Sequence, residues 1–276
     1  MSDAAPLLRT HLLPGLLETA KRNLGRGARD CAIFEIGTVF RDVAKLAHVS
    51  PVPTVARPSP ETIAEIYASV PPQPLFVGAV VVGSLDRDGW WGKGRVFDWS
   101  DATNAALSII ELTGNTGVIV QSDLAPWHPG RCAEIQVGGK PVAHAGELHP
   151  RVLDALGLPA RSCAFAVILS ELPVLPSKSS RQIFTMPAAT QDVSLIVDAA
   201  VPAATVESFL KAGAGELLES IALFDRYESL GDGKVSLAFT LTFRAPDRTL
   251  TADEVTRYRE GAVISAALGC NAVQRV

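Results

Sequence analysis

The residues between Lys234 and Arg244 alternate strictly between large apolar and small or polar side chains, and this pattern constrains the fold more than any other in the chain. The apolar positions are Val235, Leu237, Phe239, Leu241 and Phe243. Because side chains alternate between the two faces of a β-strand, one face must lie on a core. We expect the second face, with its small and polar side chains, to be open to a ligand.

This strand is the third of four that we expect in the last part of the chain. The predicted strands lie at 192–197, 218–227, 235–243 and 272–276, and the predicted helices at 202–212 and 252–267. The resulting order, β-α-β-β-α-β, is that of a ferredoxin-like domain, which we place at residues 183–276. The residues at 174–182 have the composition of a linker.

The residues before the linker, 1–173, predict a separate α+β domain built on an antiparallel or mixed sheet. Its predicted helices lie at 14–23, 101–113 and 150–156, and its predicted strands at 31–40, 75–82, 118–120, 132–137 and 162–169. The apolar run at 75–82 is typical of a central strand, and 31–40 is also expected to be buried. Ser100 is expected to cap the second helix, and the proline-rich residues 50–60 to form a surface loop.

Charge and composition exclude some classes of protein. The net charge of −4 argues against sequence-independent binding of nucleic acid through a broad basic face. Two local basic clusters exist, and each is expected to be solvated surface on sequence alone. They consist of Lys21, Arg22, Arg26 and Arg29, and of Arg244, Arg248, Arg257 and Arg259.

The sequence gives no indication of a membrane or secreted protein. No apolar run approaches the roughly 20 residues that a membrane helix needs. The four cysteines are far apart and form no Cys-x-x-Cys pair, which is typical of reduced thiols in a cytoplasmic protein.

A search for active-site chemistry finds no nucleotide-binding glycine motif, phosphate-binding loop or nucleophile elbow. Cys132, His144 and His149 have no known ligand spacing, so hydrogen-bonded histidines are expected rather than a metal site. Glu35, within an apolar segment, is either a structural ion pair or a site residue. We therefore expect no catalytic residue, metal or cofactor in this chain.

Several segments, taken together and in order, resemble the β subunits of bacterial phenylalanyl-tRNA synthetases. In the first domain they are residues 6–17 (PLLRTHLLPGLL), 34–40 (FEIGTVF), 128–131 (HPGR) and 146–150 (GELHP). In the second domain they are Pro187-Ala188, Asp192, residues 223–227 (LFDRY), 236–239 (SLAF) and 248–250 (RTL). The resemblance is to the C-terminal part of such a subunit. It implies a class II synthetase-like domain at 1–173 and a ferredoxin-fold anticodon-binding domain at 183–276.

The resemblance further implies that the first domain is catalytically inactive. Class II synthetases hold the phosphates of ATP with arginines, whose guanidinium groups bind phosphate through two parallel hydrogen bonds. The position of the first arginine is filled here by Ile33-Phe34-Glu35. The segment 165–171 (FAVILSE) lacks the glycines and the arginine of the second motif.

The partners implied by the resemblance are a catalytic α subunit, in an α2β2 assembly, and the phenylalanine tRNA. The α subunit would bind ATP and Mg and form the phenylalanyl-adenylate, while this chain supports it and binds the anticodon during aminoacylation. The apolar face of the first helix is expected at the subunit interface through Leu16, Leu17 and Leu24. The residues expected to contact tRNA are Ser194, Tyr227, Ser236, Thr240, Arg244 and Arg248.

Two features depart from the family. The chain begins near the last third of a full β subunit, so the upstream tRNA-binding, editing and magnesium-associated domains are expected to be missing, through either fragmentation or a divided gene. Gln191 also stands where an arginine is commoner.

Two alternatives remain on sequence grounds. One is a ferredoxin-like regulatory domain for a small ligand, fused to an unrelated α+β domain. Such a regulator has no need of Arg244 and Arg248 beside a polar sheet face. The other is a free-standing enzyme in the first domain, for which no convergent nucleophile, base or metal set is present.

Overall fold

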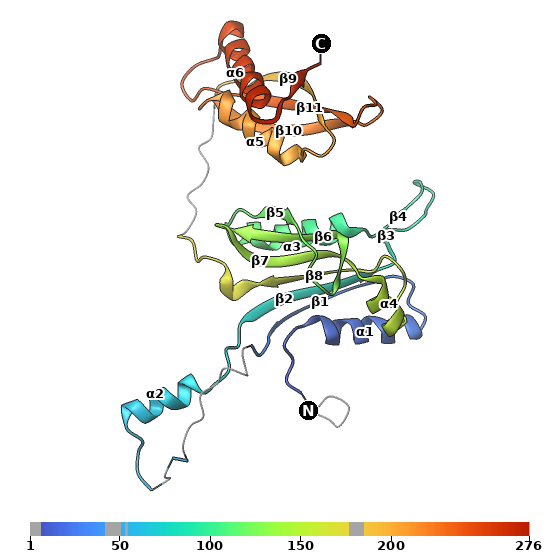
Figure 1. The fold of residues 1–276 in the computed structure, drawn as a ribbon, viewed down its shortest axis with the longest axis vertical. Coiled ribbons are helices and arrows are strands. Elements are labelled where there is room, and N and C mark those ends of the chain that lie inside the picture. Colours follow the sequence, from blue (N-terminus) through green and yellow to red (C-terminus); the bar gives the residue numbers. More distant parts are fainter. Residues whose placement is uncertain (1–6, 42–50, 53–54, 177–184, 276) are drawn as a thin grey trace. The chain divides into compact units, whose positions relative to one another are not determined.

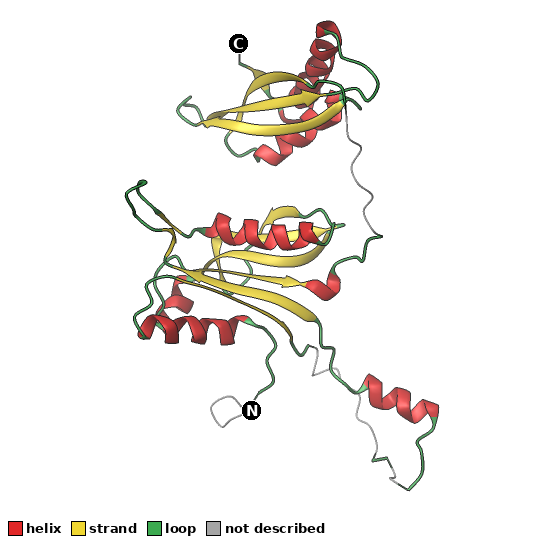
Figure 2. Ribbon diagram, turned by 180° about the vertical axis from the view of Figure 1, so that it is seen from behind, coloured by secondary structure: helices red, strands yellow, loops and turns green. Residues whose placement is uncertain are grey.

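The computed structural model describes residues 7–41, 51–52, 55–176 and 185–275, and it divides the chain into two compact units. Unit 1 is Met1–Lys178 and unit 2 is Ser179–Val276 (Figures 1 and 2). The boundary falls within the segment 174–182, of which residues 177–182 lie outside the described part.

Unit 1 is built on a six-stranded, fully antiparallel sheet in the order β1-β2-β8-β7-β6-β5. Its strands are β1 Cys31–Thr38, β2 Leu75–Val82, β5 Val118–Gln121, β6 Trp127–Val137, β7 Lys140–Leu148 and β8 Cys163–Ile168. A separate hairpin is formed by β3 Ser84–Asp86 and β4 Arg95–Val96. The helices are α1 Leu13–Gly25, α2 Pro60–Ala68, α3 Trp99–Leu112 and α4 Pro150–Leu156, and a 3-10 helix spans Leu169–Glu171.

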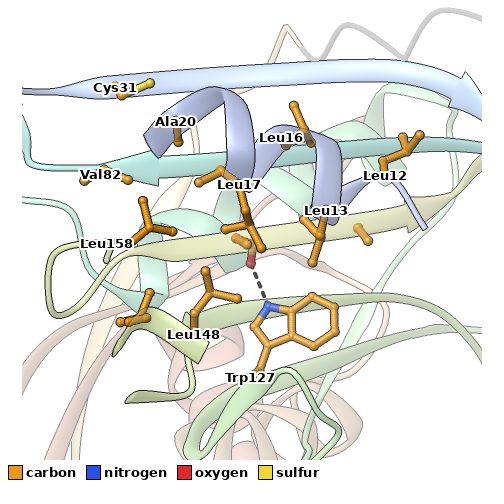
Figure 3. Packing of buried hydrophobic residues seen from close by; sticks show 14 of the residues in the cluster. Leu12, Leu13, Leu16, Leu17, Ala20, Cys31, Val82, Trp127, Leu148 and Leu158 are labelled. Atoms are coloured by element: carbon orange, nitrogen blue, oxygen red, sulfur yellow. Dashed lines mark hydrogen bonds between the residues drawn. The ribbon is translucent and has the colours of Figure 1, made fainter. Parts of the chain in front are cut away.

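Helices α1 and α3 cover opposite faces of this sheet, which creates two apolar cores (Figure 1). On the α3 side, Ala106 and Ile110 pack against strands β6, β7 and β8. On the α1 side, the indole nitrogen of the buried Trp127 donates a 3.0 Å hydrogen bond to the carbonyl oxygen of Ala164 (Figure 3). The sheet is thus buried on both faces at its centre, as the apolar run at 75–82 predicts.

The first helix lies close to β2 because Gly78 has no side chain there. A Cβ at Gly78 would lie 3.2 Å from the Cβ of Leu12 and 3.3 Å from Cδ1 of Leu16. Leu16 and Leu17 lie in the cluster under the helix (Figure 3), and each is 5% exposed. Leu24 is half-buried and packs against the same cluster. The prediction that Leu16 and Leu17 contact another subunit is wrong, because both are buried against the helix's own sheet, and for Leu24 it stays a prediction.

Two further predictions for unit 1 need correction. The strand at 31–40 is an edge strand rather than a buried one, and Phe34 is 71% exposed on it. Helix α3 is capped by Asp98 and not by Ser100, because the Asp98 carboxylate accepts a 2.8 Å bond from the Ser100 backbone nitrogen. Residues 50 and 53–54 of the predicted loop lie outside the described part, and α2 begins at its last residue, Pro60.

Unit 2 has the predicted β-α-β-β-α-β order, with a four-stranded antiparallel sheet ordered β10-β11-β9-β12. Its elements are β9 Ala189–Asp198, α5 Ala203–Ala214, β10 Leu218–Tyr227, β11 Lys234–Phe243, α6 Ala252–Cys270 and β12 Val273–Gln274. Both helices lie on one face of the sheet (Figure 2). The five apolar residues of β11 are buried against them, which confirms the alternation seen in the sequence.

The start of α6 is held by a capping box of Thr251 and Glu254, and Arg248 binds the Glu254 side chain. The Thr251 hydroxyl accepts a bond from the Glu254 backbone nitrogen, and the Glu254 carboxylate accepts one from the Thr251 backbone nitrogen. Arg248 adds two hydrogen bonds to the same carboxylate, at 2.8 and 2.7 Å. The Arg248 guanidinium and the Thr251 backbone bond lower the pKa of Glu254 from 4.5 to about 2.

The first prediction tests the place of α1 in the core. Leu17→Ala should lower the free energy of unfolding by about 2–5 kcal/mol, because it leaves a cavity under the helix. Leu112→Ala, at a position that is 87% exposed on α3, is the matched control and should change it by less than about 0.5 kcal/mol. Urea unfolding followed by circular dichroism measures both. Equal effects of the two substitutions would contradict this placement of α1.

The second prediction concerns the α6 capping box. The contribution of Glu254 to stability is present above its unfolded pKa of 4.5 and is lost as the pH falls toward about 2. Arg248→Ala removes the main cause of the shift, so the pKa of Glu254 should rise toward 4.5. NMR titration of the glutamate carboxyl carbons measures this pKa, with Arg257→Ala as a control within α6. An unchanged pKa in Arg248→Ala would show that the ion pair does not form.

Candidate functional site

The face of the unit 2 sheet opposite α5 and α6 carries most of the residues predicted to contact RNA. Strand register places Ser194 opposite Ala238, Tyr227 opposite Ser236, and Asp192 opposite Thr240. Paired residues of neighbouring strands point to the same side of a sheet. The open sheet face therefore includes Asp192, Ser194, Tyr227, Ser236, Ala238, Thr240 and, as shown below, Arg275, together with Ile196 and Asp225, which pair with Ser236 and Ala238.

One end of this face is covered by side chains from the two edge strands. The guanidinium carbon of Arg275 lies 5.6 Å from the centroid of the Tyr227 ring. Tyr227 ends β10 and Arg275 follows β12, so their contact crosses over β11 and β9. Ser236, which lies beneath, is only 5% exposed. The expectation that Ser236 is openly accessible needs correction, because a ligand must move the Tyr227–Arg275 pair to reach it.

The polar residues at the other end of the face are more accessible. The Thr240 hydroxyl donates a 2.6 Å hydrogen bond to Oδ1 of the exposed Asp192. Ser194 is partly exposed, and its carbonyl oxygen accepts a 2.8 Å bond from the Arg275 backbone nitrogen. This bond continues the β12–β9 pairing and places Arg275 on the sheet. Hydroxyl, carboxylate, aromatic and guanidinium groups thus lie together on one sheet face.

The two arginines predicted as phosphate ligands already have partners within unit 2. Arg244 donates from Nε to Glu219 and from Nη1 to the Met186 carbonyl oxygen, both at 2.8 Å. Arg248 holds the Glu254 carboxylate of the capping box. Acidic neighbours thus bind both guanidinium groups, while the Arg248 side chain is still 49% exposed. The contact of these two arginines with tRNA stays a prediction.

Arg275 is the residue that the sequence analysis missed. It lies outside both basic clusters and belongs to no alternating pattern. Its position depends on the pairing of the two-residue strand β12 with β9. Neither a charge count nor a periodicity carries a signal for such a contact.

The residues singled out in unit 1 have structural partners. Glu35, on the edge strand β1, forms an ion pair with Arg9, which supports the structural alternative for this residue. His144 Nε2 lies 3.2 Å from a carboxylate oxygen of Glu134, and burial lowers the pKa of His144. His149 caps α4 by accepting a bond from the Arg151 backbone nitrogen.

Buried thiols and histidines in unit 1 are held in their uncharged forms. Burial raises the pKa of the Cys132 thiol and lowers the pKa of His11 to about 4. Within the described ranges, no group of three or more His, Cys, Asp and Glu side chains is placed to hold a metal ion. None of the helices described is long and apolar enough to cross a membrane.

Comparison with known proteins assigns both units. Residues 1–169 match the family model described as the phenylalanyl tRNA synthetase beta chain CLM domain. Residues 185–275 match the ferredoxin-fold anticodon binding domain. The first match excludes the alternative that a ferredoxin-like module is fused to an unrelated α+β domain.

Three relatives, each named phenylalanine–tRNA ligase beta subunit, are similar over almost the whole chain. The protein of Streptomyces avermitilis is 48% identical over 275 residues, which is 97% of this chain and 33% of the relative. Those of Thermobifida fusca and Nocardia farcinica are 45% and 47% identical and cover 100% and 97% of this chain. The chain spans about a third of the length of these relatives.

The family model of the first unit matches more than half of the chain, and the model of the second matches the sheet on which the candidate site lies. The chain therefore belongs to the family of phenylalanyl-tRNA synthetase beta chains.

Proposed function

We propose that this chain is the part of a phenylalanine–tRNA ligase that binds the anticodon of the phenylalanine tRNA and supports a catalytic α subunit. The observation that carries the tRNA-binding role is the open sheet face, with Tyr227 and Arg275 in contact across it. This face lies within the residues that match an anticodon-binding domain. The relatives are three times as long, so their whole activity is part of the proposal.

The chemistry of the open sheet face suits an unpaired base. RNA sequence is read mainly on unstacked bases, which stack on aromatic rings and form hydrogen bonds through their edges. Arg275 now lies over the Tyr227 ring through a cation–π contact. A base that stacks on Tyr227 takes this place, and the displaced guanidinium is then free for a phosphate. Ser194, Ser236 and Thr240 supply hydroxyl groups for the base edge.

Unit 1 is proposed to be non-catalytic. Ile33-Phe34-Glu35 lies on the edge strand, where Glu35 is held by Arg9. The segment Cys163–Ile168 forms the buried strand β8 without any arginine. Neither sequence position at which class II synthetases carry a phosphate-binding arginine holds an arginine here. ATP and Mg belong, in this proposal, to the α subunit.

The α subunit is proposed to cover an exposed apolar groove of unit 1, in an α2β2 assembly in the cytoplasm. The groove has a volume of about 580 Å³ and lies between β1, β2 and α3. Phe34, Ile36 and Leu112 line it and are largely exposed. Exposed apolar patches of this kind mark contacts with other chains. We thus propose this groove, in place of Leu16 and Leu17 on α1, as the contact surface for the α subunit.

The third prediction tests the open sheet face. Tyr227→Ala should weaken binding of the anticodon stem-loop of the phenylalanine tRNA by about 1–3 kcal/mol at every salt concentration, since it removes a stacking ring. Tyr227→Phe keeps the ring and should bind like the parent. Arg275→Gln should lower the dependence of affinity on salt, because it removes a phosphate contact.

Fluorescence anisotropy titrations of the full chain at several salt concentrations measure these effects. Arg244→Ala plus Arg248→Ala is the comparison variant, and its effect should be smaller than that of Arg275→Gln because both arginines are engaged within unit 2. A parent-like affinity of Tyr227→Ala would place the anticodon elsewhere.

The fourth prediction concerns catalysis and the partner. The chain alone should give background phenylalanine-dependent ATP–pyrophosphate exchange, and it should capture a synthetase α subunit in a pull-down. Phe34→Asp puts a charge into the apolar groove and should abolish capture. Tyr67→Asp, at an exposed position on α2, should leave capture unchanged. Exchange by the chain alone would overturn the non-catalytic assignment, and capture by Phe34→Asp would exclude the groove.

A further inference from the structure

The hairpin between β2 and α3 carries two adjacent tryptophans at its tip. It projects from unit 1 beyond the sheet (Figure 1). The backbones of Gly89 and Gly92 exchange two hydrogen bonds of 3.0 Å, so Trp90 and Trp91 are the two central residues of a tight turn. Such positions favour Asn, Asp and Gly, because these residues adopt turn conformations readily. Large aromatic residues here are not explained by the turn.

The two tryptophans contribute little to the core of unit 1. Trp90 is 95% exposed and Trp91 is 69% exposed. Their rings contact each other edge to face, with centroids 5.8 Å apart. The Trp91 ring also lies against Gly89, where a Cβ would collide with it. An exposed aromatic pair held by its own turn is typical of a surface that binds another molecule.

The base of the hairpin forms one wall of a polar cleft, and the loop after α1 forms the other. The cleft has a volume of about 1040 Å³ and is lined by residues 27–30, 83–84, 86–88 and 93–96. It is held by ion pairs: Arg87 bonds Asp30 at 2.8 Å, and Arg95 bonds Asp101 at 2.7 and 2.6 Å. The first pair links the hairpin to the loop after α1, and the second links it to the start of α3.

Cations without partners remain in and beside this cleft. Among the described residues, neither Arg29 nor Lys93, which line it, has an acidic partner. Of the three carboxylates in the lining, Asp30 is bound by Arg87, and Asp88 accepts a 2.7 Å bond from the Gly94 backbone nitrogen. Only Asp86 has no such bond. The exposed Lys21, Arg22 and Arg26 precede the cleft at the end of α1.

We propose that this cleft and the Trp90–Trp91 tip bind an unpaired segment of RNA, as a second contact outside the anticodon. Arg29 and Lys93 bind phosphates, and a base stacks on the exposed face of Trp90. The proposal rests on the tRNA-binding function proposed above. An RNA strand is favoured over a protein partner because charged residues surround the tip. A protein that anchors on tryptophan surrounds it with apolar groups instead.

The size and lining of the cleft also suit a segment of an RNA strand better than a single small molecule. Pockets for single small molecules measure about 300–1,000 Å³ and are mostly apolar. This cleft is at the upper limit of that size, and most of the residues that line it are charged or polar. The lining has four cations and three carboxylates, and the exposed Lys21, Arg22 and Arg26 beside it make this part of the surface more positive than the chain as a whole. Such a surface suits a local contact with a polyanion.

The test compares two RNAs on the full chain: a transcript of the whole phenylalanine tRNA and its isolated anticodon stem-loop. Trp90→Ala plus Trp91→Ala should weaken binding of the whole tRNA about tenfold, which is within the contribution of one stacked base. Binding of the stem-loop should not change. Arg29→Gln plus Lys93→Gln should lower the salt dependence of whole-tRNA binding only. Tyr67→Ala removes an equally exposed aromatic residue from α2 and should have no effect.

The outcomes separate this inference from the proposed function. If the parent binds neither RNA, the tRNA-binding function fails, and this inference fails with it. If the parent binds both RNAs and the tryptophan variant binds whole tRNA equally well, only this inference is overturned. If the variant keeps its RNA affinity but no longer captures the α subunit, the tip is a protein contact. Circular dichroism checks that the variant remains folded, as the exposure of both side chains leads us to expect.

Discussion

The close approach of α1 to β2 is the contact on which the arrangement of unit 1 depends. Gly78 allows Leu12 and Leu16 to lie directly on the backbone of a central strand. The helix is then committed to its own sheet, and Trp127 completes the core beneath it. Because α1 and α3 cover opposite faces, the uncovered apolar surface is the part of β1 and β2 that α3 does not reach. The surface left for a partner thus follows from how the helices are distributed.

In unit 2, the sheet face covered by the helices forms the core, and the uncovered face is the candidate binding surface. The apolar residues of β11 are buried under α5 and α6, while the alternate residues lie on the open sheet face. One end of that face is covered, because Tyr227 and Arg275 are in contact across it. A ligand must exchange one contact for another there. In the proposed function, selectivity depends on how well the incoming base replaces the cation–π contact.

Local patterns in the sequence predict the main helices and strands, but they do not predict residue positions that depend on the whole fold. The alternation at 235–243 predicts β11 and its buried face, because a period of two is a property of the strand itself. Whether Cys31–Thr38 is central or at an edge depends on which strand pairs with it, so Phe34 could not be placed. The partners of Arg244 and the position of Arg275 likewise depend on tertiary contacts between separate elements.

The distribution of tryptophan has a practical consequence for spectroscopy. All four tryptophans, Trp90, Trp91, Trp99 and Trp127, belong to unit 1, and residues 179–276 contain none. Trp127 is shielded from water, whereas the two indoles of the hairpin are exposed to it. Tryptophan fluorescence therefore reports on ligands at the hairpin, whereas the open sheet face carries no tryptophan of its own. A soluble quencher reaches the hairpin indoles first, which gives the chain two built-in optical reporters with separate readouts.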